Sequence, residues 1–141
     1  MMASRLFMIN KVLFLLIVLF VSSGCAIAEG PKEKLSKISY NFNEGLRWGR
    51  YNDVMPVVDN GTIDSFTKMH KEWGKVVKVS GIETLQTMYD AKTKKAQVTN
   101  KYVWYRSNEM VVHETVTVQN WEYIDGRWRM MAEEYQSGEP F

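Results

Sequence analysis

The sequence predicts an α+β protein in which N-terminal helices pack on one face of a curved four-stranded antiparallel sheet. Apolar residues recur every three or four positions between residues 35 and 46, which is typical of an amphipathic helix. Residues 76–134 are instead rich in β-branched and aromatic residues and are broken by short turn signals. Helices followed by a run of strands favour a layer of helices on a sheet.

The strongest turn signal is Asp125-Gly126, which lies between two stretches of alternating residues. A type I′ turn needs positive φ at both central positions, and Asp-Gly supplies residues that tolerate it. The hairpin then fixes the cross-strand partners. The predicted pairs are Ile124 with Arg127, Tyr123 with Trp128, Trp121 with Met130, and Gln119 with Ala132.

A second turn is predicted at Ser107-Asn108. Sliding it by one residue, to Asn108-Glu109, keeps the same side chains on each face, whereas a three-residue loop would invert the faces. The first register gives these pairs: Trp104 with Val111, Tyr102 with His113, Asn100 with Thr115, Val98 with Thr117, and Ala96 with Gln119.

One face of this predicted sheet collects most of the aromatic residues together with polar side chains, among them Glu134. It is more polar than an ordinary core face, so we expect it to line a partly wet cavity. The expected cavity-lining residues are Asn100, Tyr102, Trp104, His113, Gln119 and Trp121. The opposite face carries Val112, Val116, Val118 and Met131, which predicts either a dimer or partner surface or covering by a helix or the C-terminal tail.

Three helices are predicted before the sheet. The first opens at Gly30-Pro31 and ends at Gly49, the second covers 51–58, and the third runs from 63 to 73. His70 lies near the apolar stripe of the third helix, and we interpret it as a hydrogen-bonded core or boundary residue rather than a catalytic one. The first strand follows, with a bulge at Gly81.

Residues 1–24 have the features of a signal peptide: Arg5 and Lys11 precede a ten-residue apolar run that ends in small residues. Cys25, the only cysteine, follows directly, and the stretch resembles a bacterial lipobox in which the cysteine is acylated. Ser22 stands where that motif favours leucine. The alternative is cleavage after Ala26-Ile27-Ala28, which would remove Cys25. We expect lipidation, with residues 25–31 as anchor and short linker.

Composition excludes several function classes. Without Arg5 and Lys11, 16 basic residues face 16 acidic ones, and they are interspersed, so nucleic-acid binding is not predicted. The sequence carries two histidines and no metal-ligand motif or phosphate-binding glycine loop, so neither a metal nor another cofactor is expected.

The predicted order of elements resembles the NTF2-like cone fold over residues 32–135, with 136–141 as an irregular tail. Three motifs carry the likeness to small bacterial lipoproteins of that group, which are largely uncharacterised: Trp48-Gly49-Arg50-Tyr51, Val58-Asp59, and Gln119-x-Trp121-x-Tyr123 with Gly126-x-Trp128. The resemblance implies a fold and an envelope location but no reaction, because enzymes and binding domains share this fold.

Two functions follow as hypotheses. The first is an exported, lipid-anchored, non-catalytic domain on the periplasmic side of the outer membrane, or a soluble secreted or periplasmic domain if Cys25 is lost. It would bind an envelope protein, a second copy or a small apolar ligand. The second is a proton-transfer enzyme, isomerase- or dehydratase-like, with His113 as base and Tyr102 as hydrogen-bond donor.

Overall fold

A computed structural model describes residues 29–141 of the chain. The predicted signal peptide and Cys25 lie outside these residues. The elements, in chain order, are helix α2 (Pro31–Arg47), helix α3 (Tyr51–Val54), the 3-10 turns η1 (Met55–Val57) and η2 (Asn60–Thr62), helix α4 (Ile63–Met69), and strands β1 (Val77–Asp90), β2 (Lys95–Arg106), β3 (Val112–Ile124) and β4 (Arg127–Gly138).

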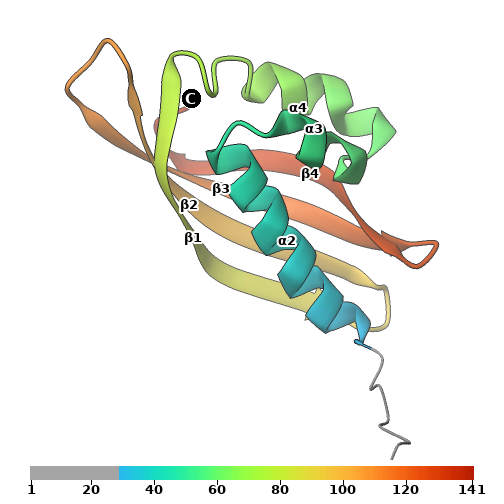
Figure 1. Cartoon of the computed structure of the whole chain (residues 1–141). Coiled ribbons are helices and arrows are strands. Elements are labelled where there is room, and N and C mark those ends of the chain that lie inside the picture. The colour runs from blue at the N-terminus through green and yellow to red at the C-terminus, as the bar shows by residue number, and fades with distance from the viewer. Residues whose placement is uncertain (1–28) are drawn as a thin grey trace, which may run out of the picture.

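The four strands form one antiparallel sheet in the order β1-β2-β3-β4. Helices α2, α3 and α4 all lie on the same face, with α2 running obliquely across it (Figure 1). The predicted α+β class and the four antiparallel strands are therefore confirmed. We call the helix-covered side the inner face and the other side the outer face.

Helix α2 has the predicted extent, because its apolar stripe packs on the sheet and Gly49, at φ 67°, allows the chain to turn after it. The second predicted helix is broken into α3 and η1, as Pro56 in its middle would dictate. The third is shorter than predicted. It ends at Met69, and Trp73 reaches the core from the turn that follows.

The β3–β4 hairpin is confirmed as far as Trp121 and Met130, and Asp125 and Gly126 both have positive φ. Beyond that point the register shifts, so Gln119 faces Glu133 instead of the predicted Ala132. A bulge of this kind inserts one residue and exchanges the two faces of the strand. As a result Glu134, predicted to point inward, is exposed, and the side chain of Glu133 is 1% exposed.

The first predicted β2–β3 register is wrong by two residues, and the observed pairs are those of the turn slid by one residue to Asn108-Glu109. Trp104 faces His113, Tyr102 faces Thr115, and Asn100 faces Thr117. The turn is longer than a two-residue loop because residues 107–111 all lie outside the strands. A two-residue slip leaves every side chain on its predicted face, so the inner face keeps its composition while the partners change.

The irregular tail expected over residues 136–141 is wrong for residues 136–138, and only 139–141 lie outside the strands. Strand β4 continues to Gly138, whose φ of 85° turns the chain back, and an added Cβ there would clash with the Glu114 carbonyl oxygen. The ring of Phe141 then packs on the inner face. Its centroid lies 4.7 Å from that of Trp73 and 5.4 Å from that of Tyr102.

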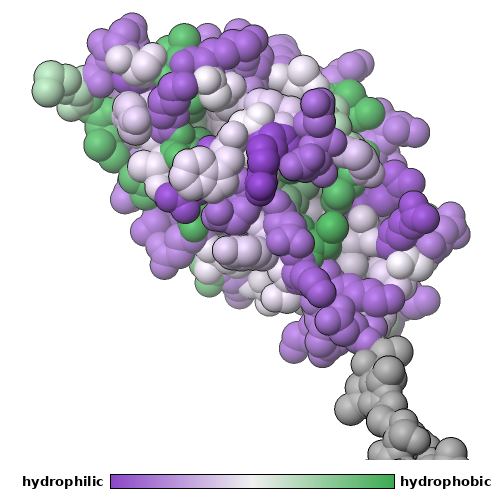
Figure 2. All heavy atoms as spheres, viewed as in Figure 1, coloured by the Kyte–Doolittle hydropathy of each residue, from purple (hydrophilic) through white to green (hydrophobic). Residues whose placement is uncertain are grey.

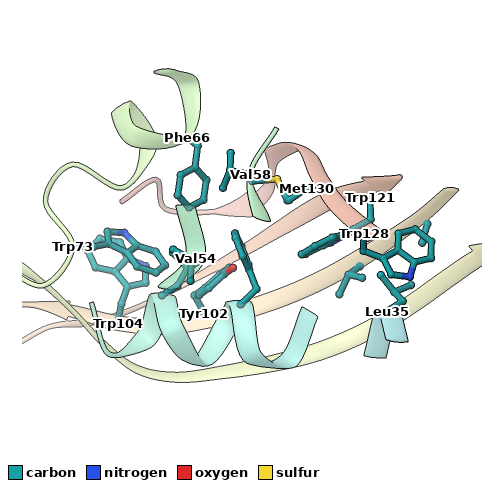
Figure 3. Packing of buried hydrophobic residues seen from close by; sticks show 14 of the residues in the cluster. Leu35, Val54, Val58, Phe66, Trp73, Tyr102, Trp104, Trp121, Trp128 and Met130 are labelled. Atoms are coloured by element: carbon teal, nitrogen blue, oxygen red, sulfur yellow. The ribbon is translucent and has the colours of Figure 1, made fainter. Parts of the chain in front are cut away.

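The core fills the space between the helices and the inner face. Trp73 and Trp104 lie at one end of it, Trp121 and Trp128 at the other, with Val58 and Met130 between them (Figure 3). On the outer face Val112 is exposed and Val116 half-buried. None of the helices among residues 29–141 covers that face, and Phe141 packs on the other one.

Candidate functional site

The inner face contains all the residues predicted to line a cavity, but they fill the space instead of surrounding it. Asn100, Tyr102, Trp104 and Gln119 are completely buried, and Trp121 is 1% exposed. The side chain of His113 is 11% exposed at the edge of the face. The wet cavity expected from the pattern is therefore replaced, at these residues, by close packing.

Glu133 lies at the centre of the polar part of this interior. Its Oε1 accepts hydrogen bonds from the Tyr102 hydroxyl at 2.9 Å and the Thr117 hydroxyl at 2.7 Å, and a longer one from the Gln119 amide at 3.3 Å. Three strands contribute these groups: β2, β3 and β4. We call Glu133, Tyr102, Thr117, Gln119 and His70 the inner cluster.

His70 faces the other oxygen of this carboxylate. Its Nε2 lies 3.3 Å from Glu133 Oε2, and both side chains are 1% exposed. Neither atom has a partner with hydrogen-bond geometry, so the contact is one of charge attraction when the ring is protonated. The ring Nδ1 lies 2.9 Å from the Phe66 carbonyl oxygen and must donate to it. Nε2 therefore carries a proton only in the charged ring.

The charge state of the cluster follows from these contacts. Burial would raise the pKa of Glu133, but the charge of His70 and the hydrogen bonds from Thr117 and Tyr102 outweigh it and hold this pKa below its ordinary value of 4.5. Burial, together with the negative charge of Glu133, raises the pKa of Tyr102 well above 10.0. The carboxylate is thus ionised and the tyrosine neutral at neutral pH.

A second set of polar contacts joins the cluster to helix α2. Asn43 donates to Asn100 Oδ1 at 3.1 Å and accepts from the Gln119 amide at 2.9 Å. Asn100 also accepts from the Thr84 hydroxyl at 2.8 Å. The polar side chains of the inner face are therefore used to tie the helix to three strands, which is the usual role of buried hydrogen-bonding groups.

His113 is separate from the inner cluster. Its ring stacks on Trp104 with centroids 4.5 Å apart, and its Nδ1 lies 2.6 Å from a carboxylate oxygen of Glu139. Tyr102 instead donates to Glu133. The predicted opposition of His113 and Tyr102 as base and donor is therefore wrong: the two-residue change in register gives each a different strand partner and a different carboxylate.

The inner cluster has the residue types of an acid–base site but not the access. Phe141 covers it from one side, with its ring centroid 6.0 Å from that of His70 and 5.4 Å from that of Tyr102. A base must come within hydrogen-bond distance of a substrate proton. In this arrangement side chains of the inner cluster already donate to Glu133 Oε1, so that oxygen has no position left for a substrate proton.

An open hollow of about 410 Å³ lies elsewhere, between α2, η1 and the β3–β4 hairpin. Figure 2 shows apolar surface in a hollow beside α2, bordered by hydrophilic residues. We call this hollow the hairpin groove. Its apolar side chains are Ile38, Pro56, Val57, Tyr123 and Trp128, and its charged ones are Glu29, Lys34, Lys37 and Arg127.

Sequence reasoning missed both Glu133 and the groove. It placed Glu134 instead of Glu133 on the inner face because nothing in the sequence around residues 131–132 marks a bulge. Ile38 and Trp128 were each recognised as packing residues, but the hollow between them depends on how α2 sits against the hairpin, which is a tertiary contact. No local pattern encodes it.

Residues 29–141 contain no group of three or more histidine, cysteine or acidic side chains arranged to hold a metal ion. No helix in the same range is long and apolar enough to cross a membrane. Comparisons with models of protein families, with curated proteins and with solved structures found no match.

Proposed function

We propose that the chain is an exported bacterial lipoprotein whose folded part is a non-catalytic binding domain of the cell envelope, built on an NTF2-like cone. Acylated Cys25 holds it at the outer membrane, facing the periplasm. The order of three helices and four antiparallel strands, with polar side chains on the inner face, supports the cone. The export signal and the position of the single cysteine support the anchor.

One observation carries the binding role: the interior is closed by its own side chains, whereas the hairpin groove is open and floored by apolar ones. Ligand sites are concave, mostly apolar and carry a few polar groups. The groove fits that description and takes a small apolar ligand. We do not propose the enzymatic alternative, because Tyr102 and His113 are bonded to different carboxylates.

The anchor is tested by the intact mass of the protein recovered from the membrane fraction of cells that express the full chain. The expected mass begins at Cys25 and includes added acyl chains. The Cys25→Ser variant is the control and should lack the acyl mass and leave the membrane fraction. A mass that begins at Glu29, found in the soluble fraction, would contradict the anchor and leave a secreted domain.

A further inference from the structure

The hairpin groove combines an apolar floor with a positively charged rim. Lys34 and Lys37 lie on α2, and Arg127 begins β4 on the opposite wall. Glu29 is the one acidic residue of 29–141 that lines the groove, and it lies 3.7 Å from Lys37. The rim therefore has an excess of positive charge that the groove itself does not neutralise.

Two of these three cations have no acidic partner among residues 29–141. Neither Lys34 nor Arg127 forms an ion pair there, whereas Lys95 and Lys101, on the same sheet, each pair with a glutamate across the strands. All three rim cations are solvent-exposed. Exposed cations beside a hollow attract anions and can pair with a carboxylate or phosphate.

The floor of the groove is held in place before any ligand arrives. The Trp128 indole N–H donates to the Pro31 carbonyl oxygen at 2.7 Å, which joins the start of α2 to the hairpin. The rings of Trp128 and Tyr123 pack with centroids 5.3 Å apart. A rigid floor reduces the conformational entropy that is lost on binding, so an apolar chain laid on it is bound more tightly.

We propose that the hairpin groove binds a long-chain fatty acid, with the acyl chain on the apolar floor and the carboxylate among Lys34, Lys37 and Arg127. The volume of about 410 Å³ is near the lower end of the range for ligand pockets, roughly 300–1,000 Å³, which favours a single chain over a two-chain lipid. The proposal rests on the binding role proposed above, but not on acylation of Cys25.

The test measures binding of radiolabelled palmitate to the protein extracted from membranes and placed in phosphatidylcholine nanodiscs. Empty nanodiscs give the palmitate that enters lipid alone. The groove variant replaces the three rim cations: Lys34→Ala, Lys37→Ala and Arg127→Ala. The matched control removes three other exposed cations, from α4 and the turns that follow it, none of which lines the groove: Lys68→Ala, Lys71→Ala and Lys75→Ala.

The groove variant should bind palmitate at least about tenfold more weakly than the natural chain, and the control should stay within about twofold. Hexadecanol, which has the same chain without the charge, should bind more weakly than palmitate and equally to all three proteins. These relative affinities would show that the rim cations bind the carboxylate of palmitate. Circular dichroism of each variant checks that the fold is kept.

Three results would overturn the proposal. One is palmitate binding no greater than that of empty nanodiscs, and another is an equal loss in the groove and control variants. The third is binding of the protein to phosphatidylglycerol vesicles, lost in the groove variant, without binding of palmitate, since that would make the rim a membrane contact. A mass that begins at acylated Cys25 would still support the anchor in all three cases.

Discussion

The inner cluster and the hairpin groove both combine aromatic and charged side chains, yet they differ in whether the charged groups are paired. In the inner cluster the carboxylate of Glu133 meets His70 and receives three hydrogen bonds from side chains that are themselves buried. In the groove, Lys34 and Arg127 form no ion pair within residues 29–141 and remain exposed beside an apolar floor.

This difference separates stability from binding. Polar groups that bond to one another in the interior hold the fold together and specify how α2 sits on the sheet. Exposed polar groups around an open hollow reduce the stability of the folded state only slightly, and they remain available to a ligand. Changes in the inner cluster should therefore affect unfolding, and changes in the groove should affect binding.

The largest effect is expected from Glu133→Ala. Removing the carboxylate leaves the Tyr102 and Thr117 hydroxyls buried without their acceptor and His70 buried without the opposite charge, and breaking a buried pair in this way costs about 3–5 kcal/mol. Urea unfolding followed by tryptophan fluorescence measures it. The control is Glu134→Ala, the exposed neighbour, which should change the free energy of unfolding by less than about 0.5 kcal/mol. Equal effects would mean that Glu133 is not the centre of the cluster.

Tyr102→Phe should have a smaller effect of the same kind. It removes the hydroxyl that donates to Glu133 but keeps the ring against Trp73 and Phe141. A hydrogen bond to a charged group contributes about 1.5–3 kcal/mol, and we expect a loss near the middle of that range. The control is Tyr105→Phe, since Tyr105 is 40% exposed. A loss no larger than that of the control would contradict the role of this bond.

The pH dependence of unfolding should carry the signature of Glu133. Its pKa in the folded chain is lower than its ordinary value of 4.5, so its contribution to stability is complete above pH 4.5 and is lost as the pH falls through the folded-state pKa. The natural chain should therefore lose more stability than Glu133→Gln between pH 6 and pH 3. Parallel loss in the two proteins, measured by urea unfolding at each pH, would exclude this linkage.

How far the sequence predicts these two regions depends on whether the signal is local. The Asp125-Gly126 turn and the apolar stripe of α2 are local, and both were predicted correctly. The cross-strand partner of Tyr102 is not predicted by a local signal. A two-residue change in register leaves every side chain on the same face, so the alternation of side chains cannot distinguish the two registers. In the observed register Trp104 stacks on His113 and donates a hydrogen bond to Thr115, and these are contacts that the alternation of side chains does not encode.

The sequence also fails to predict the bulge near Met131, which decides which acidic residue enters the candidate site. The bulge turns Glu133 inward and Glu134 outward, and no glycine or proline marks it. The pattern of polar and apolar residues therefore predicts a polar inner face correctly but assigns Glu134 to it in place of Glu133. His70 was predicted as a hydrogen-bonded core or boundary residue, and its 2% exposure and its bond to Phe66 confirm this.

The smallest effect on stability is expected in the groove. The combined replacement of Lys34, Lys37 and Arg127 by alanine should change the free energy of unfolding by no more than about 0.5 kcal/mol per site, as is usual for exposed side chains away from special features. Urea unfolding in the absence of fatty acid checks this. A loss comparable with that of Glu133→Ala would mean that the rim cations hold the fold, and the contrast between the two regions would fail.

The most direct test of that contrast uses the indole N–H signals of the five tryptophans in the ¹⁵N-labelled protein during titration with palmitate. All four of Trp73, Trp104, Trp121 and Trp128 are buried, but only Trp128 of these lines the groove. We predict that the Trp128 signal shifts progressively and saturates while those of Trp73, Trp104 and Trp121 stay in place. Shifts of Trp73 and Trp104 with an unmoved Trp128 would contradict it, because the ligand would then have entered the interior beneath Phe141.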